Sequence, residues 1–274
     1  MSDRLPISVL LLARDEAERL ESLLSSLGFA REVVVVVDAA SGDATQAVAE
    51  RCGARVFVRA LQGFGAQRQF ALAQCREEWV LWIDADERLD PEAVGAIAGA
   101  LASGRATGYR FARRTWFLGK AIRHCGWRGE RVLRLFRRSA ARFDDALVHE
   151  SVSVAGKVGD LPGVIEHHSY PDWPTCREKL FRYASAGAAK ARLEGRGAGA
   201  LDVVLRPPLR FLRMFVLQLG FLDGAHGAAL CGLAATQVLL KYVELWRCPA
   251  GDTADDARRG GQGPKQHNRQ AGGR

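Results

Sequence analysis

A run of five valines, in the segment REVVVVVD from Arg31 to Asp38, places the tightest constraint on how this chain can fold. Valine is β-branched and favours strands, and a strand without polar alternation has to be covered on both of its faces. Strands of this kind belong to parallel sheets that carry helices on each side. The run therefore predicts an interior strand of an α/β domain.

The same strand–helix rhythm extends over the first hundred or so residues. Strands are expected at 7–13, 31–38, 55–58 and 78–84, and helices at 15–28, 42–53, 65–75 and 91–104. Alternation of this kind builds a mostly parallel sheet flanked by helices. Ligands of such sheets bind beyond the carboxyl ends of the strands, where Asp38 and Asp84 are expected.

The pattern changes after Gly104. Shorter strands, antiparallel or mixed, are expected in 108–119, 131–138 and 150–156, then a helix from Trp173 to Glu194 and two apolar helices near 207–222 and 225–246. The polar, glycine-rich tail from Pro249 to Arg274 is expected to be disordered.

Acidic residues crowd the end of the fourth expected strand, in WIDADERLDPE. Asp84 and Asp86 are two positions apart, so in an extended chain both side chains point the same way. Two carboxylates that close repel each other unless a cation lies between them, and Mg²⁺ or Mn²⁺ is the natural candidate. The alternative is a solvated turn, which we retain for Glu87 and for Asp90 as a helix cap before Pro91.

Asp38, at the end of the valine strand, can accept hydrogen bonds from a bound nucleotide. A plain turn acid is the alternative, at even odds. A nicotinamide-dependent dehydrogenase is disfavoured, because the first strand leads into ARDEAE and not into a glycine-rich turn.

Positive charge is concentrated in one part of the chain. The net charge is +8, and the segment between Arg105 and Arg142 holds twelve basic residues and one acidic residue, Glu130. This basic stripe implies a polyanionic partner, such as nucleic acid, acidic lipid head groups or a phosphorylated substrate, or else a solvated surface. Six scattered cysteines and the lack of a recognisable export signal suit a reducing cytosol.

The segment PPLRFLRMFVLQLGFL has Arg210, Arg213 and Gln218 near one stripe and apolar residues over the rest. This pattern suits a helix that lies in a membrane interface. Residues 224–240 carry no formal charge, but this stretch is at the short end for a membrane span. Peripheral attachment is favoured over a soluble helical subdomain.

Four early segments, SVLLLARDEAERLESLLSSL, VVVVVDAASGDAT, QGFGAQRQFAL and WVLWIDADERLDPE, together resemble family 2 glycosyltransferases of the GT-A fold. The later segments RRTWFLGKAIRHCGW, VLRLFRR and ARFDDALVHE resemble the branch of lipopolysaccharide inner-core β-1,4-glucosyltransferases. The resemblance implies a nucleotide-sugar-binding half at 1–104, an acceptor-binding half at 105–170, a helical extension that can associate with a membrane at 171–248, and the tail at 249–274.

The resemblance also implies roles for single residues. Asp38 would contact the nucleotide, with Leu11 to Arg14 beside its uracil. Asp84 and Asp86 would hold Mg²⁺ or Mn²⁺ and the donor diphosphate. The loop after Asp38 reads AASGD, so Ala39 cannot supply the second acid that is common there.

Family members invert the sugar carbon by direct displacement, which requires a base for the acceptor hydroxyl. Glu130 and Glu150 are the candidates for this base, with Glu130 slightly preferred. His149 is either a further metal ligand or a hydrogen-bonded core histidine, and we prefer the second. His167 and His168 are expected to be structural.

The implied partners are a UDP-sugar, expected to be UDP-glucose, and a lipid A–core acceptor at the cytoplasmic face of the inner membrane. Five arginines are expected to contact anionic groups of that acceptor: Arg113, Arg114, Arg134, Arg137 and Arg138. The alternatives are a transferase of the same fold with another glycan or lipid-linked acceptor, and a nucleic-acid-binding module built on the basic stripe, although no nucleic acid is expected.

Overall fold

The computed structural model describes residues 4–144 and 152–247. His149, Glu150 and the predicted disordered tail therefore lie outside the described residues. The chain divides into two compact units. Unit 1 holds the residues up to Arg123 and Trp127–Pro171, and unit 2 holds His124–Gly126 and the residues from Asp172 onward. The predicted boundary between residues 104 and 105 lies inside unit 1 and stays a prediction.

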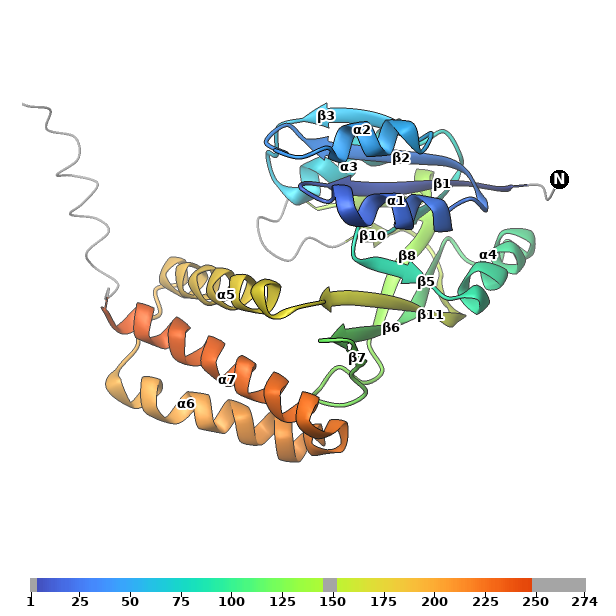
Figure 1. Ribbon diagram of the computed structural model, residues 1–274. Coiled ribbons are helices and arrows are strands. Elements are labelled where there is room, and N and C mark those ends of the chain that lie inside the picture. The colour runs from blue at the N-terminus through green and yellow to red at the C-terminus, as the bar shows by residue number, and fades with distance from the viewer. Residues whose placement is uncertain (1–3, 145–151, 248–274) are drawn as a thin grey trace, which may run out of the picture. The chain divides into compact units, whose positions relative to one another are not determined.

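Unit 1 is built on one mixed sheet with the strand order β3-β2-β1-β4-β8-β6-β11-β5 (Figure 1). Its first half is parallel and consists of β1 (Leu5–Ala13), β2 (Ala30–Asp38), β3 (Arg55–Arg59) and β4 (Trp79–Trp82). The helices between and after them are α1 (Ala17–Ser26), α2 (Thr45–Arg51), α3 (Phe64–Gln74) and α4 (Pro91–Ser103). The predicted strand–helix alternation and the predicted fold class are confirmed.

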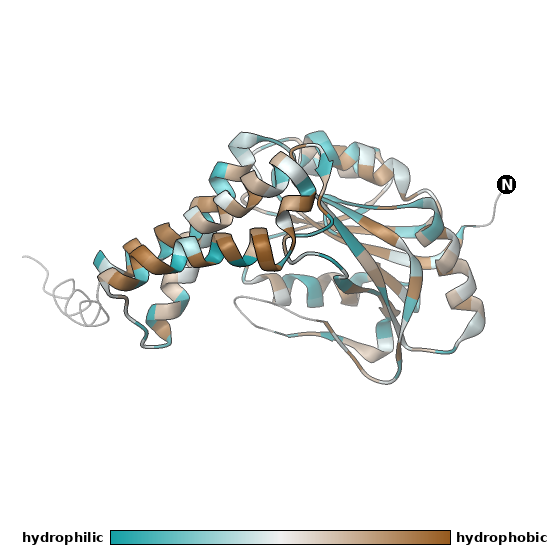
Figure 2. Ribbon diagram, turned by 90° about the horizontal axis from the view of Figure 1, so that it is seen from below, coloured by the Kyte–Doolittle hydropathy of each residue, from teal (hydrophilic) through white to brown (hydrophobic). Residues whose placement is uncertain are grey.

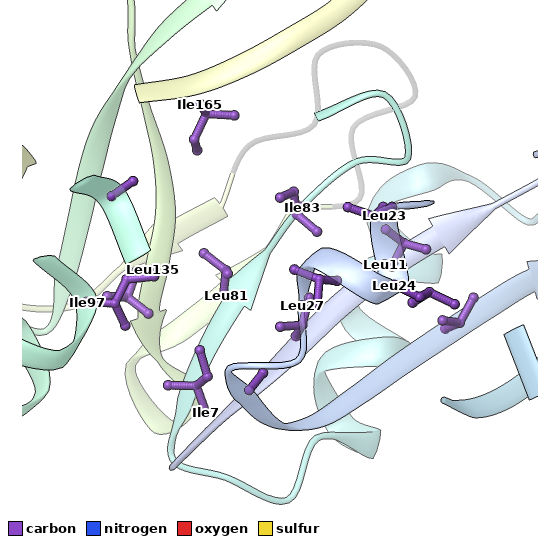
Figure 3. Packing of buried hydrophobic residues seen from close by; sticks show 14 of the residues in the cluster. Ile7, Leu11, Leu23, Leu24, Leu27, Leu81, Ile83, Ile97, Leu135 and Ile165 are labelled. Carbon is purple, nitrogen blue, oxygen red and sulfur yellow. The ribbon is translucent and has the colours of Figure 1, made fainter. Parts of the chain in front are cut away.

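The valine strand is covered on both faces. Val35 and Val37 pack into a cluster with α1, α2 and α4, whereas Val34 and Val36 pack into a second cluster with α3. Figure 3 shows the first cluster, in which Leu23 of α1 lies near Leu11 of β1. Burial on both sides is the reason that this strand needs no polar alternation.

The second half of the sheet is mixed, as expected. β8 (Arg131–Arg137) runs antiparallel to β4 and to β6 (Gly108–Phe117), and β6 runs parallel to β11 (Val158–Tyr170). The short strands are β5 (Glu87–Leu89), β7 (Lys120–Ala121), β9 (Ala141–Phe143) and β10 (Val152–Val154).

β11 was not predicted, because Pro162, Gly163 and several polar residues interrupt its hydrophobic pattern. Its pairing with β6 on one side and with β5 on the other holds it in place instead. At the start of α4, the side chain of Asp90 accepts a hydrogen bond from the Ala93 amide at 2.8 Å, which confirms the predicted cap.

Unit 2 is helical and contains α5 (Trp173–Leu193), α6 (Ala200–Leu212) and α7 (Gly224–Arg247). The prediction that a helix starts at about residue 207 was wrong, because α6 begins at Ala200 and has Pro207 and Pro208 in its interior. The cause is a local cap at Gly199, whose amide donates to the Asp202 side chain at 3.0 Å. By length and composition, the helical stretch Gly220–Arg247 meets the requirement for a membrane span.

Two glycines with positive φ offer a matched test of this fold. At Gly163 in β11 (φ +86°), an added Cβ would lie 2.2 Å from the Ala93 nitrogen, whereas at Gly119 (φ +79°) it would meet nothing within 4 Å. Gly119→Ala should cost about 1–2 kcal/mol of unfolding free energy, the usual penalty of the left-handed conformation. Gly163→Ala should cost clearly more in urea denaturation, because α4 would have to shift. Equal losses would show that this contact does not matter.

Candidate active site

The acids at the strand ends of the parallel half converge on one edge of the sheet. Asp38 ends β2 and Asp84 follows β4, and β1 lies between these two strands. Neighbouring strands are about 4.8 Å apart, so the ends of β2 and β4 are separated by about 10 Å. The prediction that Asp38 and Asp84 share this edge is confirmed.

Asp38 is held in a defined orientation although it lies at a loop. Its side chain is buried, and Arg14 Nη1 lies 3.3 Å from its Oδ2 atom. Its Oδ1 atom accepts a hydrogen bond from the Ala40 amide at 3.1 Å. Arg14 and Asp38, both predicted to contact the nucleotide, are therefore neighbours.

Two further acids stabilise the loops around Asp38. Hydrogen bonds from the Thr45 hydroxyl and the Ala17 amide lower the pKa of Asp43 to about 2. Asp15 accepts a hydrogen bond from the Gly42 amide at 2.7 Å. The loop AASGD, which departs from the common family pattern, is thus tied to the start of α1.

The carboxylate of Asp84 accepts hydrogen bonds from three side chains. Arg134 Nη2 lies 2.8 Å from Oδ2, while Arg68 Nη2 and Trp82 Nε1 lie 3.3 and 3.2 Å from Oδ1. Burial by itself raises the pKa of Asp84, but the guanidinium groups of Arg134 and Arg68 outweigh it and hold the pKa below its ordinary value. Asp84 is therefore a fixed, ionised carboxylate.

Glu87 was expected in a solvated turn, and this prediction was wrong. It is fully buried, it accepts a hydrogen bond from Arg134 at 2.6 Å, and its second oxygen accepts one from the Asp84 amide at 3.2 Å. Burial, together with the charge of Asp84, raises the pKa of Glu87 against the opposing effect of Arg134. In the sequence Glu87 is one acid among four in a row of turn residues, and no local signal distinguishes it.

The aromatic ring of Trp82 supports both guanidinium groups. The Cζ atom of Arg134 lies 3.9 Å from the ring centroid and that of Arg68 lies 4.4 Å from it. Such cation–π contacts strengthen when they are shielded from water, as Arg134 and Arg68 are here. We call Asp84, Glu87, Arg134, Arg68 and Trp82 the Arg134 cluster.

Asp86, the second acid of the pair, contacts a histidine of the unpredicted strand. The Nε2 atom of His167 lies 3.3 Å from Asp86 Oδ2, because β11 pairs with β5 and sets His167 opposite Glu87. The next residue, His168, donates its amide proton to the Asp86 carbonyl at 2.8 Å, and its ring stacks on Trp116. His167 was expected to be structural, and only the pairing of β11 reveals its position.

The donor atoms of Asp84 and Asp86 fit a hard divalent cation. Both are carboxylates, and they lie two positions apart in the short segment between β4 and β5. Within residues 4–144 and 152–247, no group of three or more His, Cys, Asp or Glu side chains is arranged to hold a metal. The pair therefore fits as two oxygen ligands, of the kind that leave further positions to substrate phosphates.

Acids from elsewhere in unit 1 pair with part of the basic stripe. Arg110 pairs with Asp160 at 2.9 Å and Arg114 pairs with Glu166 at 2.8 Å. Both acids lie on β11, so folding lowers the positive charge of the stripe but does not remove it.

The structure corrects the predicted set of acceptor-binding arginines. Arg137 on β8 lies opposite Trp79, the first residue of β4, in the antiparallel register. The side chain of Arg138 donates a hydrogen bond to the Cys75 carbonyl at 2.6 Å. Both therefore lie at the opposite end of β4 from Asp84 and do not belong to this site. Arg134 is buried in its cluster, where it holds the two carboxylates.

Glu130, the preferred candidate for the base, forms a two-pronged ion pair with Arg113. Arg113 donates to the two Glu130 oxygens at 2.6 and 3.1 Å, and its Nη1 atom lies 3.9 Å from Glu87. Arg113 therefore links Glu130 to the Arg134 cluster. Each Glu130 oxygen keeps a lone pair that can accept a further hydrogen bond from a hydroxyl.

A separate surface pocket of about 310 Å³ lies at the amino ends of β1 and β2. Arg31 and Arg55 line it and form ion pairs with Glu77 and Glu32. It is at the wrong edge of the sheet for the acids described above and is not the candidate site.

Comparison with known proteins agrees with this site. The family model "Glycosyl transferase family 2" matches residues 8–151, which include β1, β2, β4 and all the acids of the edge. The chain belongs to glycosyl transferase family 2.

Two curated relatives and two solved structures illustrate the similarity. The lipopolysaccharide core biosynthesis glycosyltransferase LpsC of Rhizobium meliloti is 29% identical over 89% of this chain and 95% of that protein. An uncharacterised glycosyltransferase of Rickettsia typhi is 26% identical over 81% of this chain and 80% of its own length.

Glucosyl-3-phosphoglycerate synthase of Mycobacterium tuberculosis, crystallised with Mn²⁺, UDP-glucose and phosphoglyceric acid, is 28% identical over 39% of this chain and 43% of its own, with a TM-score of 0.34. The S. aureus TarS structure covers 93% of this chain and 92% of its own at 16% identity and a TM-score of 0.41.

The Arg134 cluster gives a clear stability prediction. Arg134→Met leaves Glu87 buried without its partner and should cost about 3–5 kcal/mol of unfolding free energy in urea denaturation. The double variant Arg134→Met/Glu87→Leu should recover a large part of this loss, because it removes the buried charge as well.

Arg114→Met is the matched control for this prediction. It breaks a solvent-accessible pair with Glu166 and should cost less than about 1 kcal/mol. If Arg134→Met were no more destabilising than Arg114→Met, the cluster would not be a structural requirement.

Proposed function

We propose that this protein is an inverting transferase that moves a hexose, glucose in the first instance, from a UDP-sugar to a heptose of a lipopolysaccharide inner core. The observation that carries the proposal is the meeting of Asp38, Asp84 and Asp86 at one edge of the sheet in a chain of this family. The similarity to LpsC, a lipopolysaccharide core biosynthesis glycosyltransferase, over nearly the full chain supports an acceptor from the lipopolysaccharide core.

The two strand ends divide the recognition of the donor between them. Asp38 accepts hydrogen bonds from the nucleoside, and Arg14 lies beside it. Asp38 ends β2, which is about one strand spacing from β1 and about two from β4. Asp84 and Asp86 then lie where the diphosphate of the same nucleotide ends.

Mg²⁺ or Mn²⁺ bound by Asp84 and Asp86 would offset the negative charge that grows on the departing diphosphate. Arg134, Arg68 and Trp82 hold Asp84 as an oriented anion, so the site needs little rearrangement when it is loaded. His167 orients Asp86 in the same way.

The acceptor hydroxyl attacks the sugar carbon and transfers its proton to a carboxylate, for which Glu130 and Glu150 are the candidates. Of the five predicted arginines, Arg113 and Arg114 remain as contacts for anionic groups of the acceptor. These groups would replace Glu130 and Glu166, with which the two arginines now pair. His149 stays a candidate for a further metal ligand, with the core-histidine interpretation preferred. The reaction takes place at the cytoplasmic face of the inner membrane.

A transferase of the same fold that uses another glycan or lipid-linked acceptor is the second candidate, because the donor side of the site would be the same. A nucleic-acid-binding function is disfavoured, because the ion pairs of the stripe with Asp160, Glu130 and Glu166 reduce its free positive charge.

The metal-binding acids can be tested with purified protein, UDP-glucose, Mn²⁺ and truncated lipopolysaccharide, with UDP release as the measurement. Asp84→Asn and Asp86→Asn should each lower kcat/KM by about 10²-fold or more, because each removes charge from the ligand set. A chelator should abolish turnover, and added Mn²⁺ should restore it.

Asp90→Asn is the matched control, because asparagine also caps helices well and Asp90 caps α4. It should retain nearly full turnover. Undiminished transfer by Asp84→Asn and Asp86→Asn would disprove the metal site, while activity with a different UDP-sugar would remove only the glucose assignment.

The base is identified by comparing Glu130→Gln with Glu150→Gln. Loss of the base should lower kcat by about 10²- to 10⁴-fold while UDP binding, measured by calorimetry, is retained. Glu166→Gln is the control, because it breaks an equivalent arginine pair on the neighbouring strand. If neither Glu130→Gln nor Glu150→Gln loses more turnover than Glu166→Gln, the base is another residue.

A further inference from the structure

α6 presents three different faces around its axis. Residues of an α-helix follow one another at about 100°, which sorts residues 201–212 into three arcs, and a π-helical turn, Arg213–Leu217, continues the helix directly after them. The first arc is covered by the helical unit itself and includes Pro207 and, in the π-helical turn, Met214, which are buried. The packing of α6 against α7 accounts for this arc.

The second arc is apolar and yet exposed to solvent. It spans roughly 140° of the helix surface. Figure 2, coloured by hydropathy, shows that hydrophobic and hydrophilic residues alternate along the helices of the protein. The exposed large members of the second arc are Leu201, Val204, Leu205, Leu209, Leu212 and, in the π-helical turn, Val216.

The exposed apolar surface continues beyond the end of α6. Leu217 is 78% exposed, and Leu219, Phe221 and Leu222 are exposed in the turn before α7. Leu219 adopts a positive φ of 57°, which is uncommon for leucine and keeps this turn compact. A surface this continuous is unusual for a face that stays in water. We call the second arc and this turn the α6 apolar face.

The third arc borders the α6 apolar face with arginines. Arg206, Arg210 and Arg213 are exposed and follow one another at helical spacing. Arg206 pairs with Asp202 at 2.5 Å, but no acid among the described residues pairs with Arg210 or Arg213. Apolar residues with a flank of unneutralised arginines match the boundary between acyl chains and anionic lipid head groups.

We infer that the α6 apolar face lies in the surface of an anionic bilayer, with Arg210 and Arg213 at its phosphates, and that α6 does not span the membrane. The benefit of this membrane contact rests on the proposed function, because a lipid-anchored acceptor is confined to the surface of a bilayer. A second copy of the chain would also cover the apolar residues, but only an anionic bilayer offers an apolar layer and a layer of phosphates side by side, as the α6 apolar face and its two arginines require.

Vesicle flotation tests this without sugar nucleotide or acceptor, so its result does not depend on whether the transferase assignment is right. The intact protein should float with vesicles that contain phosphatidylglycerol. Leu205→Glu and Leu212→Glu should each weaken binding by about tenfold or more, because each places a charge in the apolar layer. Arg210→Glu/Arg213→Glu should weaken binding by a similar factor on these vesicles but not on phosphatidylcholine alone.

Val58→Glu is the matched control, because it adds the same charge at a valine of β3 that is 52% exposed in unit 1. It should float as the unchanged protein does, and circular dichroism should show that all variants are folded. Equal loss by Val58→Glu, or no loss by Leu205→Glu, would overturn the inference.

Analytical ultracentrifugation tests whether a second copy of the chain binds the α6 apolar face instead of a bilayer. A dimer that Leu205→Glu dissociates, in a protein that does not float with vesicles, would assign the face to a second copy and also overturn the inference. Transfer to a delipidated, soluble acceptor should be equal in Leu205→Glu and the unchanged protein, which separates docking from catalysis.

Discussion

The ion pairs of Arg134 with Asp84 and Glu87 are the interaction on which the site depends. Glu87 is fully buried and the neighbouring Asp84 is partly exposed, and two carboxylates this close do not both stay ionised without a positive charge beside them. Arg134 supplies that charge with its guanidinium on the Trp82 ring, and Glu87 in turn accepts the Asp84 amide. Asp84 is thus held in place by Arg134, which a second acid, Glu87, holds in turn.

The change of strand direction at β4 makes this arrangement possible. β4 is the last strand of the parallel half, and β8 runs antiparallel beside it, with Leu135 opposite Leu81. This register brings Arg134, the residue before Leu135, to the end of β4 where Asp84 begins the loop. β11 then adds His167 beside Asp86 from the other half of the sheet. Asp38 and Asp84 therefore come from the parallel half of the sheet, whereas Arg134 and His167, which contact the acids, come from the mixed half.

Unit 2 follows a different physical rule. Its helices bury part of their apolar surface against one another, and α6 keeps a wide apolar face that nothing in the described unit covers. In a soluble domain this exposure would lower solubility, whereas at a lipid surface it is the source of binding.

The sequence by itself determined the parallel half of the sheet, because the valine run and the helical periodicities act over a few neighbouring residues. It also determined which strands end in Asp38 and Asp84, and it marked the amphipathic pattern around Arg210 and Arg213. The sequence did not predict β11, because Pro162 and Gly163 interrupt the alternation that is typical of a strand. Pairing with β6 holds β11 in the sheet without that alternation.

Only the tertiary structure decided the roles of Glu87, Arg134 and His167 and the partial neutralisation of the basic stripe. Arg134 reaches Glu87 across 47 positions of the chain, and Arg114 reaches Glu166 across 52. Contacts over such separations leave no periodicity in the sequence, because they are set by strand order and register and not by local conformational preference.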